Sequence, residues 1–577
     1  MGEFVIGAGK AEIDYRHLLK RPLMGFNDEN QIAEKVIGQL AARAFVIETD
    51  GNLIALVVAD IWSGTESIRT ALLKRLKGTE LGARLSGGHL MVAGTHTHSG
   101  PSGITDHRLY AQLSGGYSQA VVDDIALAMC KALQQADQTR RPARIEILDI
   151  VDKGDAASGA WFGNRSLEAY KANPEAERNR HRSAVEKNFA TLLFREADTG
   201  ALIGSLNFLA VHGTALGPDN RNLSGDIPGN VSTHIEGFVT RRKLAGAAPF
   251  VAGSLNGCCG DISPNMKASG EGYVQKRQRV PHNPIAQVEH WGEEAIDWFK
   301  GLFAGNHAPP QTEEEGFVAL AEEIGAAFAA AHGAPESKTH LASFPTTVEG
   351  EIHAAYGTPD MTDWQDGDKR TWRGAVGLST LAGAVMDGPG PLGLREGITT
   401  QNASITERGL WSLLMEVSSR TPKKDIVQLV GPIPNALTDA VVGLLKLKFD
   451  MDTDAISVGA DYVGGQAPKP VAILTRRISP ESPPKQVFWL GPILIAALPG
   501  EMTTMAGRRL RDALGQVCNP SGQRPSHVLT VCYANDYCQY VTTPEEYDCQ
   551  HYEGASTLFG RHTLDAHVAH LTNLARA

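Results

Sequence analysis

The most informative stretch of the sequence reads Leu90-Met91-Val92-Ala93-Gly94-Thr95-His96-Thr97-His98-Ser99-Gly100-Pro101. Its apolar first half predicts a short buried strand, which runs into His-Thr-His before a Ser-Gly-Pro turn. Side chains two residues apart in an extended chain point to the same face, so we expect His96 and His98 to project together. Two adjacent imidazoles can bind a metal ion, or one can bind while the other moves protons. The structural alternative is a pair of hydrogen-bonded histidines beneath a turn.

The amino-acid composition and net charge exclude some classes of protein. The chain has 577 residues, of which 42% are hydrophobic and 21% charged, and its formal net charge is -11. These fractions are typical of a soluble globular protein, and the length suggests roughly three or four domains of ordinary size. The acidic balance argues against general nucleic-acid binding, which needs a basic surface. No apolar run approaches the ~20 residues that a membrane-spanning helix needs.

The N-terminal residues and the cysteines indicate the cellular compartment of the protein. The first residues lack the charged and apolar regions of a signal peptide, so the sequence as it stands predicts a cytoplasmic protein. A secreted or periplasmic protein is the alternative if a leader has been removed. The seven cysteines match no zinc-knuckle spacing, and we expect reduced thiols. A disulfide within the group Cys532, Cys538 and Cys549 stays open.

Strand and helix patterns alternate along the first part of the chain. Residues 41–60 read as two strands around the turn Asp50-Gly51-Asn52, a helix follows over 64–77, and another is expected over 118–137. This alternation indicates an α/β fold with mixed β-sheets flanked by helices. Residues 266–345 contain a polar, basic stretch, a charged break and an alanine-rich segment, and we expect a possible insertion or subdomain there.

Five apolar strand patterns run into residues that can carry chemistry: His96 with His98, His212, Asp261 with Ser263, Glu501, and Tyr540. In open α/β sheets, sites form beyond the carboxyl ends of strands, where the loops converge. Two histidines, a carboxylate and a tyrosine hydroxyl make a suitable nitrogen and oxygen shell for zinc. Each residue alone has an ordinary structural explanation, for example a core position for Tyr540. Together they favour a metal-dependent hydrolase whose active site lies at the C-terminal ends of the strands.

Several longer runs resemble motifs of the neutral/alkaline (non-lysosomal) ceramidases. They are Gly94-Thr-His-Thr-His-Ser-Gly-Pro101, Gly260-Asp-Ile-Ser-Pro-Asn265, Pro499-Gly-Glu-Met-Thr-Thr-Met-Ala-Gly-Arg-Arg-Leu-Arg511, Tyr540-Val-Thr-Thr-Pro-Glu-Glu-Tyr547 and Tyr552-Glu-Gly-Ala-Ser-Thr-Leu-Phe-Gly560. The runs occur in the family's order and span nearly the whole chain. The resemblance implies a catalytic domain over residues 1–577 that cleaves the N-acyl bond of ceramide to a sphingoid base and a fatty acid. Its partner is then a lipid substrate.

The resemblance also implies roles for individual residues. One catalytic Zn²⁺ is expected on four ligands, His96, His212, Glu501 and Tyr540, whereas a second, structural metal is left open. Four residues match catalytic or substrate-side positions of the family: Ser263, His98, Tyr552 and Arg165. The sequence pattern by itself reads Arg165 as a solvated loop residue.

The implied chemistry suits these residue types. Zinc lowers the pKa of its water to about 7 and polarises an amide carbonyl. Tyr552 and Ser263 would donate hydrogen bonds to the oxyanion, and His98 would protonate the leaving amine. Zinc-bound water is the favoured nucleophile. The alternative, an acyl-enzyme on Ser263, needs a base beside that serine.

The chain departs from the family in two respects. It stops just after a helix predicted over 564–574, so the immunoglobulin-like C-terminal domain of most members is expected to be absent. Cys258 stands where the family typically has asparagine, which is expected to alter the floor of the site. An amidase or esterase of the same fold that acts on another N-acyl lipid or a soluble acyl compound is therefore the second hypothesis. A non-catalytic lipid-binding protein is the third.

Overall fold

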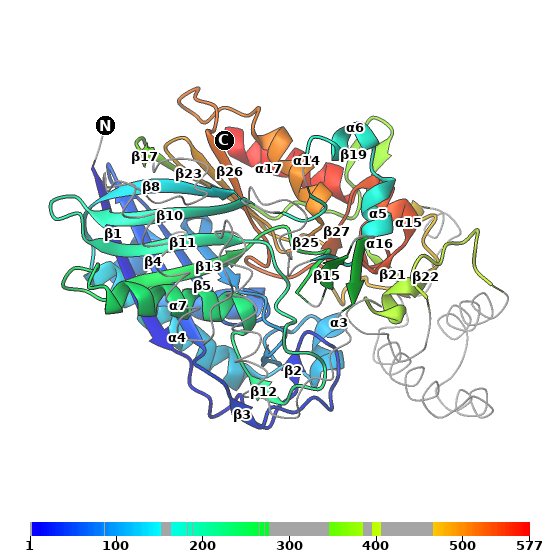
Figure 1. Ribbon diagram of the computed structural model, residues 1–577, viewed down its shortest axis with the longest axis horizontal. Coiled ribbons are helices and arrows are strands. Elements are labelled where there is room, and N and C mark those ends of the chain that lie inside the picture. The colour runs from blue at the N-terminus through cyan, green and yellow to red at the C-terminus, as the bar shows by residue number, and fades with distance from the viewer. Residues whose placement is uncertain are drawn as a thin grey trace.

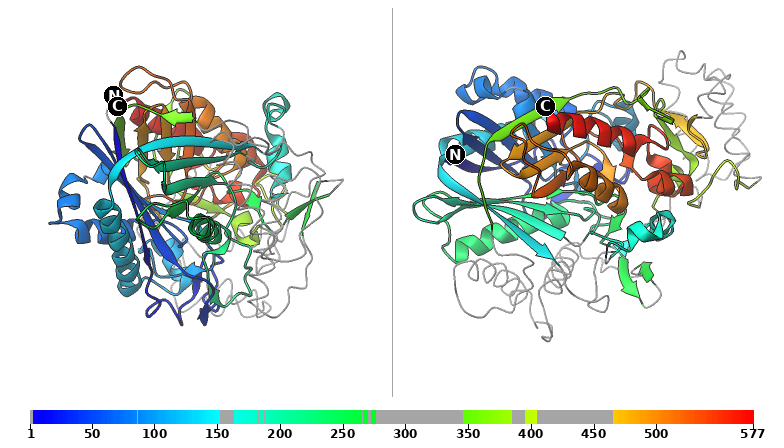
Figure 2. Two further views of the ribbon diagram at one scale, coloured as in Figure 1. Left: turned by 60° about the vertical axis from the view of Figure 1, so that its left-hand side comes forward. Right: turned by 90° about the horizontal axis from the view of Figure 1, so that it is seen from above.

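The computed structural model describes residues 3–151, 163–264, 266–269, 272–275, 346–384, 395–404 and 465–577, apart from residues 86, 182 and 187. Two β-sheets pack against each other, and helices cover their outer faces (Figures 1 and 2). The expected α/β class with mixed sheets is therefore confirmed. The predicted insertion over 266–345 begins with a hairpin of β15 (Met266–Ser269) and β16 (Gly272–Gln275), and the rest of it lies outside the described residues.

The larger sheet has nine strands in the order β13-β11-β10-β8-β1-β4-β5-β6, with β17 paired to β8. Their bounds are β13 (Val251–Asn256), β11 (Leu202–Leu209), β10 (Asn188–Glu196), β8 (Arg141–Val151), β1 (Phe4–Glu12), β4 (Ala41–Thr49), β5 (Asn52–Ala59), β6 (Leu90–Gly94) and β17 (Thr346–Val348). The pairs β5–β6 and β11–β13 are parallel. The sheet twists so far that β13 also contacts β4, β5 and β6. The ends of β6 and β11 are thereby brought together.

The smaller sheet has the order β18-β23-β24-β26, with bounds β18 (Ile352–Gly357), β23 (Lys485–Leu490), β24 (Ile493–Ala497) and β26 (His527–Val531). Only the pair β24–β26 is parallel within it. The sequence pattern predicts one strand-like run over 487–498, and this is wrong in detail. Gly491 has φ 53° and turns the chain, so the run forms the antiparallel hairpin β23–β24.

Two apolar clusters hold the layers together. The inner cluster lies between the sheets and joins Phe45 and Phe194 of the larger sheet to Phe488 and Ile495 of the smaller one. The outer cluster lies beneath the helices, whose bounds are α1 (Glu66–Leu76), α4 (Gln119–Gln138), α7 (Asp226–Arg241), α14 (Thr504–Leu514) and α17 (Thr563–Arg576). Helices α4 and α7 cover the larger sheet, and α14 and α17 cover the smaller one (Figure 1).

Local sequence explains several of these boundaries. Asp50 and Gly51 both have positive φ, 49° and 81°, and form the two-residue turn expected between β4 and β5. Helix α1 begins after Thr65, whose side chain accepts a hydrogen bond from the backbone of Ile68. Both α1 and α4 agree with the predicted helices over 64–77 and 118–137 to within two residues.

Short elements connect the layers and carry much of the site. The helical ones are α2 (Glu80–Arg84), η1 (Gly87–His89), α3 (Arg108–Ala111), η2 (Gln112–Ser114), α5 (Leu167–Ala172), α6 (Glu175–Arg178), η3 (Leu378–Ala382), α15 (Pro544–Cys549) and α16 (Tyr552–Ser556). The two-stranded ribbons are β2 (Leu23–Met24) with β7 (Gly100–Pro101), β3 (Lys35–Val36) with β12 (Asn222–Leu223), β9 (Gly163–Asn164) with β14 (Ile262–Ser263), β19 (Gln365–Asp366) with β20 (Lys369–Arg370), β21 (Ala375–Gly377) with β22 (Val471–Leu474), and β25 (Glu501–Met502) with β27 (Tyr540–Val541).

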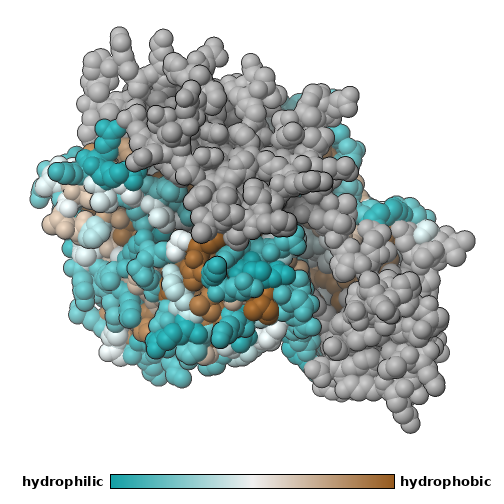
Figure 3. All heavy atoms as spheres, turned by 60° about the horizontal axis from the view of Figure 1, so that its bottom comes forward, coloured by the Kyte–Doolittle hydropathy of each residue, from teal (hydrophilic) through white to brown (hydrophobic). Residues whose placement is uncertain are grey.

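The described surface is mainly hydrophilic. On the face shown in Figure 3, apolar residues appear in small groups between polar ones. The large hydrophobic residues that are exposed within the described ranges are Tyr117, Leu127 and Leu244. No helix of the described part is long and apolar enough to cross a membrane.

Candidate metal centre and active site

The segments that follow β6 and β11 run side by side at the ends of their strands. Thr97 and Gly213 form a parallel bridge, and the backbone N–H of His98 donates to the carbonyl of Gly213 at 2.8 Å. A Cβ atom on Gly213 would lie 2.3 Å from the carbonyl oxygen of His96, so only glycine permits this approach. His96 itself has φ 65°, a left-handed conformation that is costly for this residue type.

This backbone arrangement brings three imidazoles together. The Nε2 atom of His96 lies 3.2 Å from Nε2 of His212 and 3.3 Å from Nε2 of His98. His96 and His212 are fully buried, whereas His98 keeps 8% of its surface exposed and therefore lies at the open side of the group. His96 and His98 project together, as expected, but the left-handed backbone at His96 shows that the chain there is not extended, as that expectation had assumed. The structure adds His212 from a different strand.

Backbone carbonyls orient two of the three rings. The Nδ1 atom of His96 lies 3.0 Å from the carbonyl oxygen of Trp62, and Nδ1 of His212 lies 3.1 Å from that of Cys259. A carbonyl oxygen can only accept, so each Nδ1 carries the proton and each Nε2 presents a lone pair when the ring is neutral. By contrast, Nδ1 of His98 has no hydrogen-bond partner among the described residues.

Glu501 comes from a segment that follows a strand of the smaller sheet, and its carboxylate lies beside the imidazoles of His96 and His212. It follows β24 and lies in β25, directly opposite Tyr540 in the parallel pair with β27. Its Oε2 atom is 3.5 Å from Nε2 of His96 and 3.4 Å from Nε2 of His212. Tyr537 donates a hydrogen bond to Oε1, and Tyr533 donates one to Oε2 at 3.3 Å.

These donors suit a divalent metal ion. Two Nε2 lone pairs that face each other at 3.2 Å, with a carboxylate oxygen beside them, repel unless a cation or a proton lies between them. Burial, reinforced by the Arg165 cation, lowers the pKa of His212 to about 3, so its ring is neutral at physiological pH. Burial and the neighbouring rings of His96 and His212 likewise lower the pKa of His98. Histidine nitrogens together with a carboxylate are a donor set typical of zinc.

Arg165, Tyr540 and Tyr552 form a second group beside the imidazoles. The Arg165 guanidinium donates to the hydroxyl of Tyr540 at 2.9 Å and to the carbonyl of Gly260 at 2.8 Å. Its Nε donates to Oε1 of Glu553 at 2.9 Å in an ion pair whose side chains are 4% and 3% exposed. The rings of Tyr540 and Tyr552 meet edge to face at 5.3 Å. Arg165 is thus buried in the site, and the reading as a solvated loop residue is wrong.

Burial raises the pKa of Tyr540 and Tyr552, and the nearby Glu501 carboxylate raises both further. Both phenols therefore keep their protons at physiological pH and can donate hydrogen bonds. Their hydroxyls lie in an environment that suits a developing negative charge, because the Arg165 cation is next to both rings.

Ser263 lies in β14, which joins the two groups. The residue before it, Ile262, accepts a hydrogen bond from the backbone N–H of His212 at 3.2 Å. The backbone N–H of Arg165 donates to the carbonyl of Asp261 at 2.9 Å, and Ser263 pairs with Gly163 across the β9–β14 ribbon. Ser263 is fully buried. Asp261 has a structural position, since its Oδ1 atom accepts two hydrogen bonds from Thr504 at 2.8 Å.

The structure therefore gathers seven of the eight predicted site residues into two adjoining groups, and the backbone of the β9–β14 ribbon places Ser263 beside them. It also shows four residues that the sequence did not single out as parts of the site: Tyr533, Tyr537, Cys259 and Glu553. Each is next to a predicted motif, but nothing in the local pattern separates them from ordinary core residues. The side chain of Cys258 points away from the imidazoles, toward Thr530 at 3.3 Å and Arg511 at 3.8 Å. All seven cysteines are free, in agreement with the expected reduced thiols.

Comparisons with known proteins agree with this geometry. A family model described as neutral/alkaline non-lysosomal ceramidase, N-terminal, matches residues 4–283 and 454–569, well over half of the chain. The curated relatives include Neutral ceramidase 2 of Arabidopsis thaliana, 27% identical over 96% of this chain and 73% of its own length. Neutral ceramidase A of Dictyostelium discoideum is 28% identical over 96% of this chain and 70% of its own length.

Solved structures are similar as well. A structure described as ceramidase complexed with C2 is 25% identical, covers 100% of this chain and 75% of its own, and superposes with a TM-score of 0.69. The neutral ceramidase of Pseudomonas aeruginosa, at 23% identity and a TM-score of 0.68, shares the fold. The chain therefore belongs to the neutral/alkaline non-lysosomal ceramidase family and is a hydrolase of the amide-cleaving class.

Proposed function

We propose that this protein is a zinc-dependent amidohydrolase that cleaves the N-acyl bond of ceramide into a sphingoid base and a fatty acid. The observation that carries the proposal is the convergence of the Nε2 atoms of His96 and His212 on the Oε2 atom of Glu501, with Nε2 of His98 3.3 Å from that of His96. The curated relatives that resemble this chain over nearly its whole length are named neutral ceramidases, which supports ceramide as the substrate.

We assign the zinc ion to His96, His212 and Glu501, with Tyr540 as the fourth ligand. His96 and His212 have the arrangement usual for zinc-binding histidines, because their second ring nitrogen donates to a backbone carbonyl. Tyr540 stands opposite Glu501 in the β25–β27 pair. Zinc bound there polarises an amide carbonyl and makes a nucleophilic water available near neutral pH.

His98 is assigned the role of proton carrier. Because its pKa is lowered, it is neutral at rest, so it takes a proton from the attacking water and delivers that proton to the leaving amine. His98 is the most exposed of the three imidazoles, and its Nδ1 lacks the carbonyl partner that fixes the tautomer of the other two rings. Either ring nitrogen can therefore hold the proton. A sphingoid amine departs poorly as an anion, so a proton delivered during bond cleavage accelerates the reaction, typically by about 10²–10⁴-fold.

Tyr552 and Ser263 are assigned to the oxyanion, and Arg165 to the orientation of the tyrosines. A protonated phenol at Tyr552 donates a hydrogen bond as negative charge develops on the carbonyl oxygen, and such a donor contributes about 3 kcal/mol. Arg165 fixes the hydroxyl of Tyr540 and lies next to the ring of Tyr552. A direct attack by Ser263 remains the alternative route, and it requires a base beside that hydroxyl.

The test is fatty-acid release from detergent-dispersed ceramide by the protein as purified, after chelation, and after addition of zinc. We expect release to stop with the chelator and to return with zinc. Calcium at the same concentration serves as the matched control and is expected to restore nothing. If protein shown to contain zinc releases no fatty acid from ceramide, ceramide is the wrong substrate, and other N-acyl amides and esters become the candidates. If chelated protein keeps full activity, zinc dependence is wrong.

A further inference from the structure

Both carboxylate oxygens of Glu501 have defined hydrogen-bond or ion-pair partners. Its two oxygens have different partners: Oε2 faces His96 and His212 at 3.5 and 3.4 Å, whereas Oε1 accepts a hydrogen bond from Tyr537. Tyr533 donates a second bond to Oε2, at 3.3 Å. A carboxylate can only accept, so both phenol hydroxyls must donate toward Glu501.

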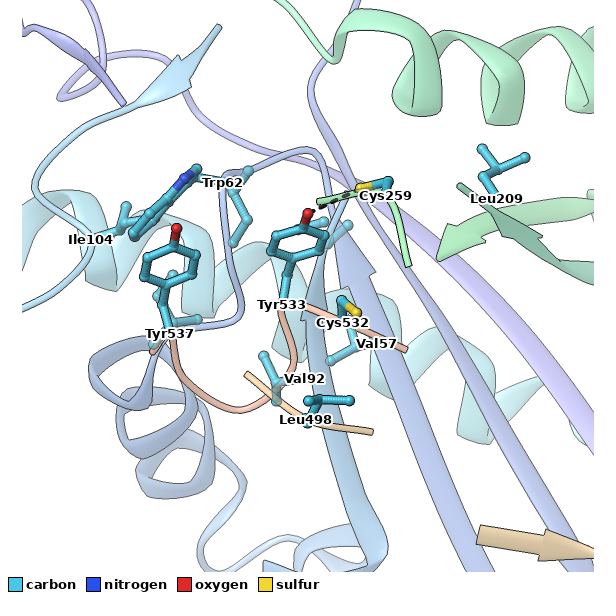
Figure 4. Packing of buried hydrophobic residues seen from close by; sticks show 14 of the residues in the cluster. Val57, Trp62, Val92, Ile104, Leu209, Cys259, Leu498, Cys532, Tyr533 and Tyr537 are labelled. Carbon is cyan, nitrogen blue, oxygen red and sulfur yellow. Dashed lines mark hydrogen bonds between the residues drawn. The ribbon is translucent and has the colours of Figure 1, made fainter. Parts of the chain in front are cut away.

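Each of the two tyrosines is itself held in place. The ring of Tyr533 stacks on the ring of His96 at 3.7 Å with an interplanar angle of 13°, and its hydroxyl lies 3.0 Å from the sulfur of Cys259. Because the Tyr533 hydroxyl donates its hydrogen bond to Glu501, it can only accept one from Cys259, so the Cys259 thiol is the donor in that contact. The ring of Tyr537 packs against Trp62 at 3.8 Å. Figure 4 shows both hydroxyls pointing to the same side, with Cys259 beside Tyr533 and Trp62 beside Tyr537.

The backbone that presents these hydroxyls is strained and firmly attached. Tyr533, Asn535 and Gln539 have φ values of 59°, 64° and 62°, in the left-handed region that non-glycine residues seldom adopt. The segment is fixed to β6, because the N–H of Asn535 donates to Val92 at 2.7 Å and the carbonyl of Tyr533 accepts from Gly94. Strain of this kind persists where the surroundings enforce it, and it concentrates at functional sites. Strand β6, which leads into His96, thus also positions the hydroxyls that hold Glu501.

We propose that Tyr537 and Tyr533, the latter held by the Cys259 thiol, are positioning residues that orient Glu501 for the metal ion and set the affinity of the site for zinc. Tyr537 occupies Oε1 and so leaves Oε2 as the oxygen that faces the imidazoles. Without that hydrogen bond the carboxylate can rotate or present both oxygens. Hydrogen bonds to ligating groups typically change metal affinity by about 10–100-fold. This inference rests on the zinc site proposed above and extends it to residues that do not touch the metal.

The experiment is a zinc titration of metal-free wild type, Tyr537→Phe and Tyr110→Phe in competition with a chromophoric chelator. Tyr110 is the matched control, because it packs on Tyr537 at 4.9 Å while its buried hydroxyl has no hydrogen-bond partner among the described residues. We expect Tyr537→Phe to bind zinc about 10–100-fold more weakly and Tyr110→Phe to match wild type. The absorption spectrum of the cobalt-substituted protein should change in Tyr537→Phe only, since it reports the geometry around the metal.

A merely structural role is separated by thermal unfolding of the metal-free proteins. Tyr537→Phe loses a buried hydrogen bond and is expected to unfold at a lower temperature than Tyr110→Phe, but to be fully folded at the temperature of the titration. The inference is overturned if Tyr537→Phe binds zinc as tightly as wild type, or if both variants lose the same affinity. A wild-type protein without affinity for zinc would overturn the zinc dependence proposed above together with this inference. Retained affinity in Tyr537→Phe alone would overturn only the inference.

Discussion

The two sides of the candidate metal centre are held by different kinds of contact. On the side of the larger sheet, His96 and His212 are oriented by the backbone carbonyls of Trp62 and Cys259. On the side of the smaller sheet, Glu501 is oriented by the side chains of Tyr533 and Tyr537. Backbone contacts survive most single substitutions, whereas a side-chain contact is lost with one. The imidazole side should therefore be robust to mutation, and the carboxylate side should be sensitive to it.

The largest expected effect on zinc binding is the loss of the carboxylate itself. Glu501→Ala should lose both bound zinc and ceramide hydrolysis, because the site loses its carboxylate donor and keeps only imidazoles and a phenol. Ser263→Ala is the control that should lower activity and keep zinc. Metal analysis of both purified variants checks the zinc-to-protein ratio. Full zinc occupancy in Glu501→Ala would show that the ligand assignment is wrong.

The orientation of the imidazoles rests on backbone contacts, so a change in the backbone should disturb it. In Gly213→Ala, the new Cβ would lie 2.3 Å from the carbonyl oxygen of His96 and 2.8 Å from Cα of Thr97. We expect the two histidine segments to separate, at a cost of about 1–3 kcal/mol in the free energy of unfolding and with weaker zinc binding. Gly217→Ala, four residues away, has nothing within 4 Å of its Cβ and should behave like wild type. Urea unfolding and zinc titration measure both; equal behaviour of the two variants would contradict the close approach at Gly213.

A substitution behind the second group should separate catalysis from metal binding. Glu553→Gln removes the charge that faces the buried Arg165 guanidinium, and breaking such a pair costs about 3 kcal/mol of stability. The hydroxyl of Tyr540 and the ring of Tyr552 then lose their fixed neighbour, so kcat/KM should fall. Zinc occupancy should fall much less, because the other three proposed ligands, His96, His212 and Glu501, keep their own contacts. As a control, Asp363→Asn breaks the exposed pair with Arg370 and should change neither quantity. Unchanged kcat/KM in Glu553→Gln would argue against a positioning role for Arg165.

The smallest effect on zinc affinity is expected from a substitution of Lys485, a buried lysine outside the candidate site. Lys485 in β23 is fully buried, and burial lowers its pKa from 10.5 to about 7. The unfolded chain therefore binds this proton more readily, and stability falls as the pH drops from about 10 toward 7 and is level below that. Lys485→Met removes this dependence, so its gain in unfolding free energy over wild type should be larger at pH 7 than at pH 9.5. Zinc affinity should not change.

The outcome for Lys485 is read from urea unfolding of wild type and Lys485→Met at the two pH values. The neighbouring His567 and His570 have pKa values lowered by burial and stay neutral between pH 7 and 9.5, and Cys538, whose pKa is raised to about 12, stays protonated, so the difference between the two proteins isolates the lysine. A gain that is equal at both pH values would show that the lysine is not destabilised by its burial.

The sequence predicted the ends of the strands better than it predicted the side-chain contacts beyond those ends. Apolar runs that stop at His96, His212 and Glu501 are visible as patterns, because burial imposes them residue by residue. The twist that brings the segment after β6 beside the segment after β11 depends on the sum of many strand pairings, so no local stretch of sequence indicates it. The roles of the individual ligands came from the resemblance to a family.

The side chains that hold the site residues in place could not be predicted from the sequence pattern. Tyr537 and Trp62 read as ordinary core aromatics, and only the fold places one over the other and beside Glu501. Helix α7 was not predicted, since Pro228 and Gly229 in its first turn weaken the helical pattern, and packing on β13 stabilises it instead. The turn at Gly491 was missed because the residues on both sides are uniformly apolar.

The central claim is that the imidazoles and Glu501 together hold zinc, and anomalous diffraction from crystals of the zinc-loaded protein tests it most directly. Data collected on the two sides of the zinc absorption edge should show one strong peak, about 2.0–2.2 Å from Nε2 of His96, Nε2 of His212 and Oε2 of Glu501. The same map shows whether Tyr540 or His98 is the fourth ligand. A zinc peak elsewhere, with none between His96, His212 and Glu501, would contradict the account.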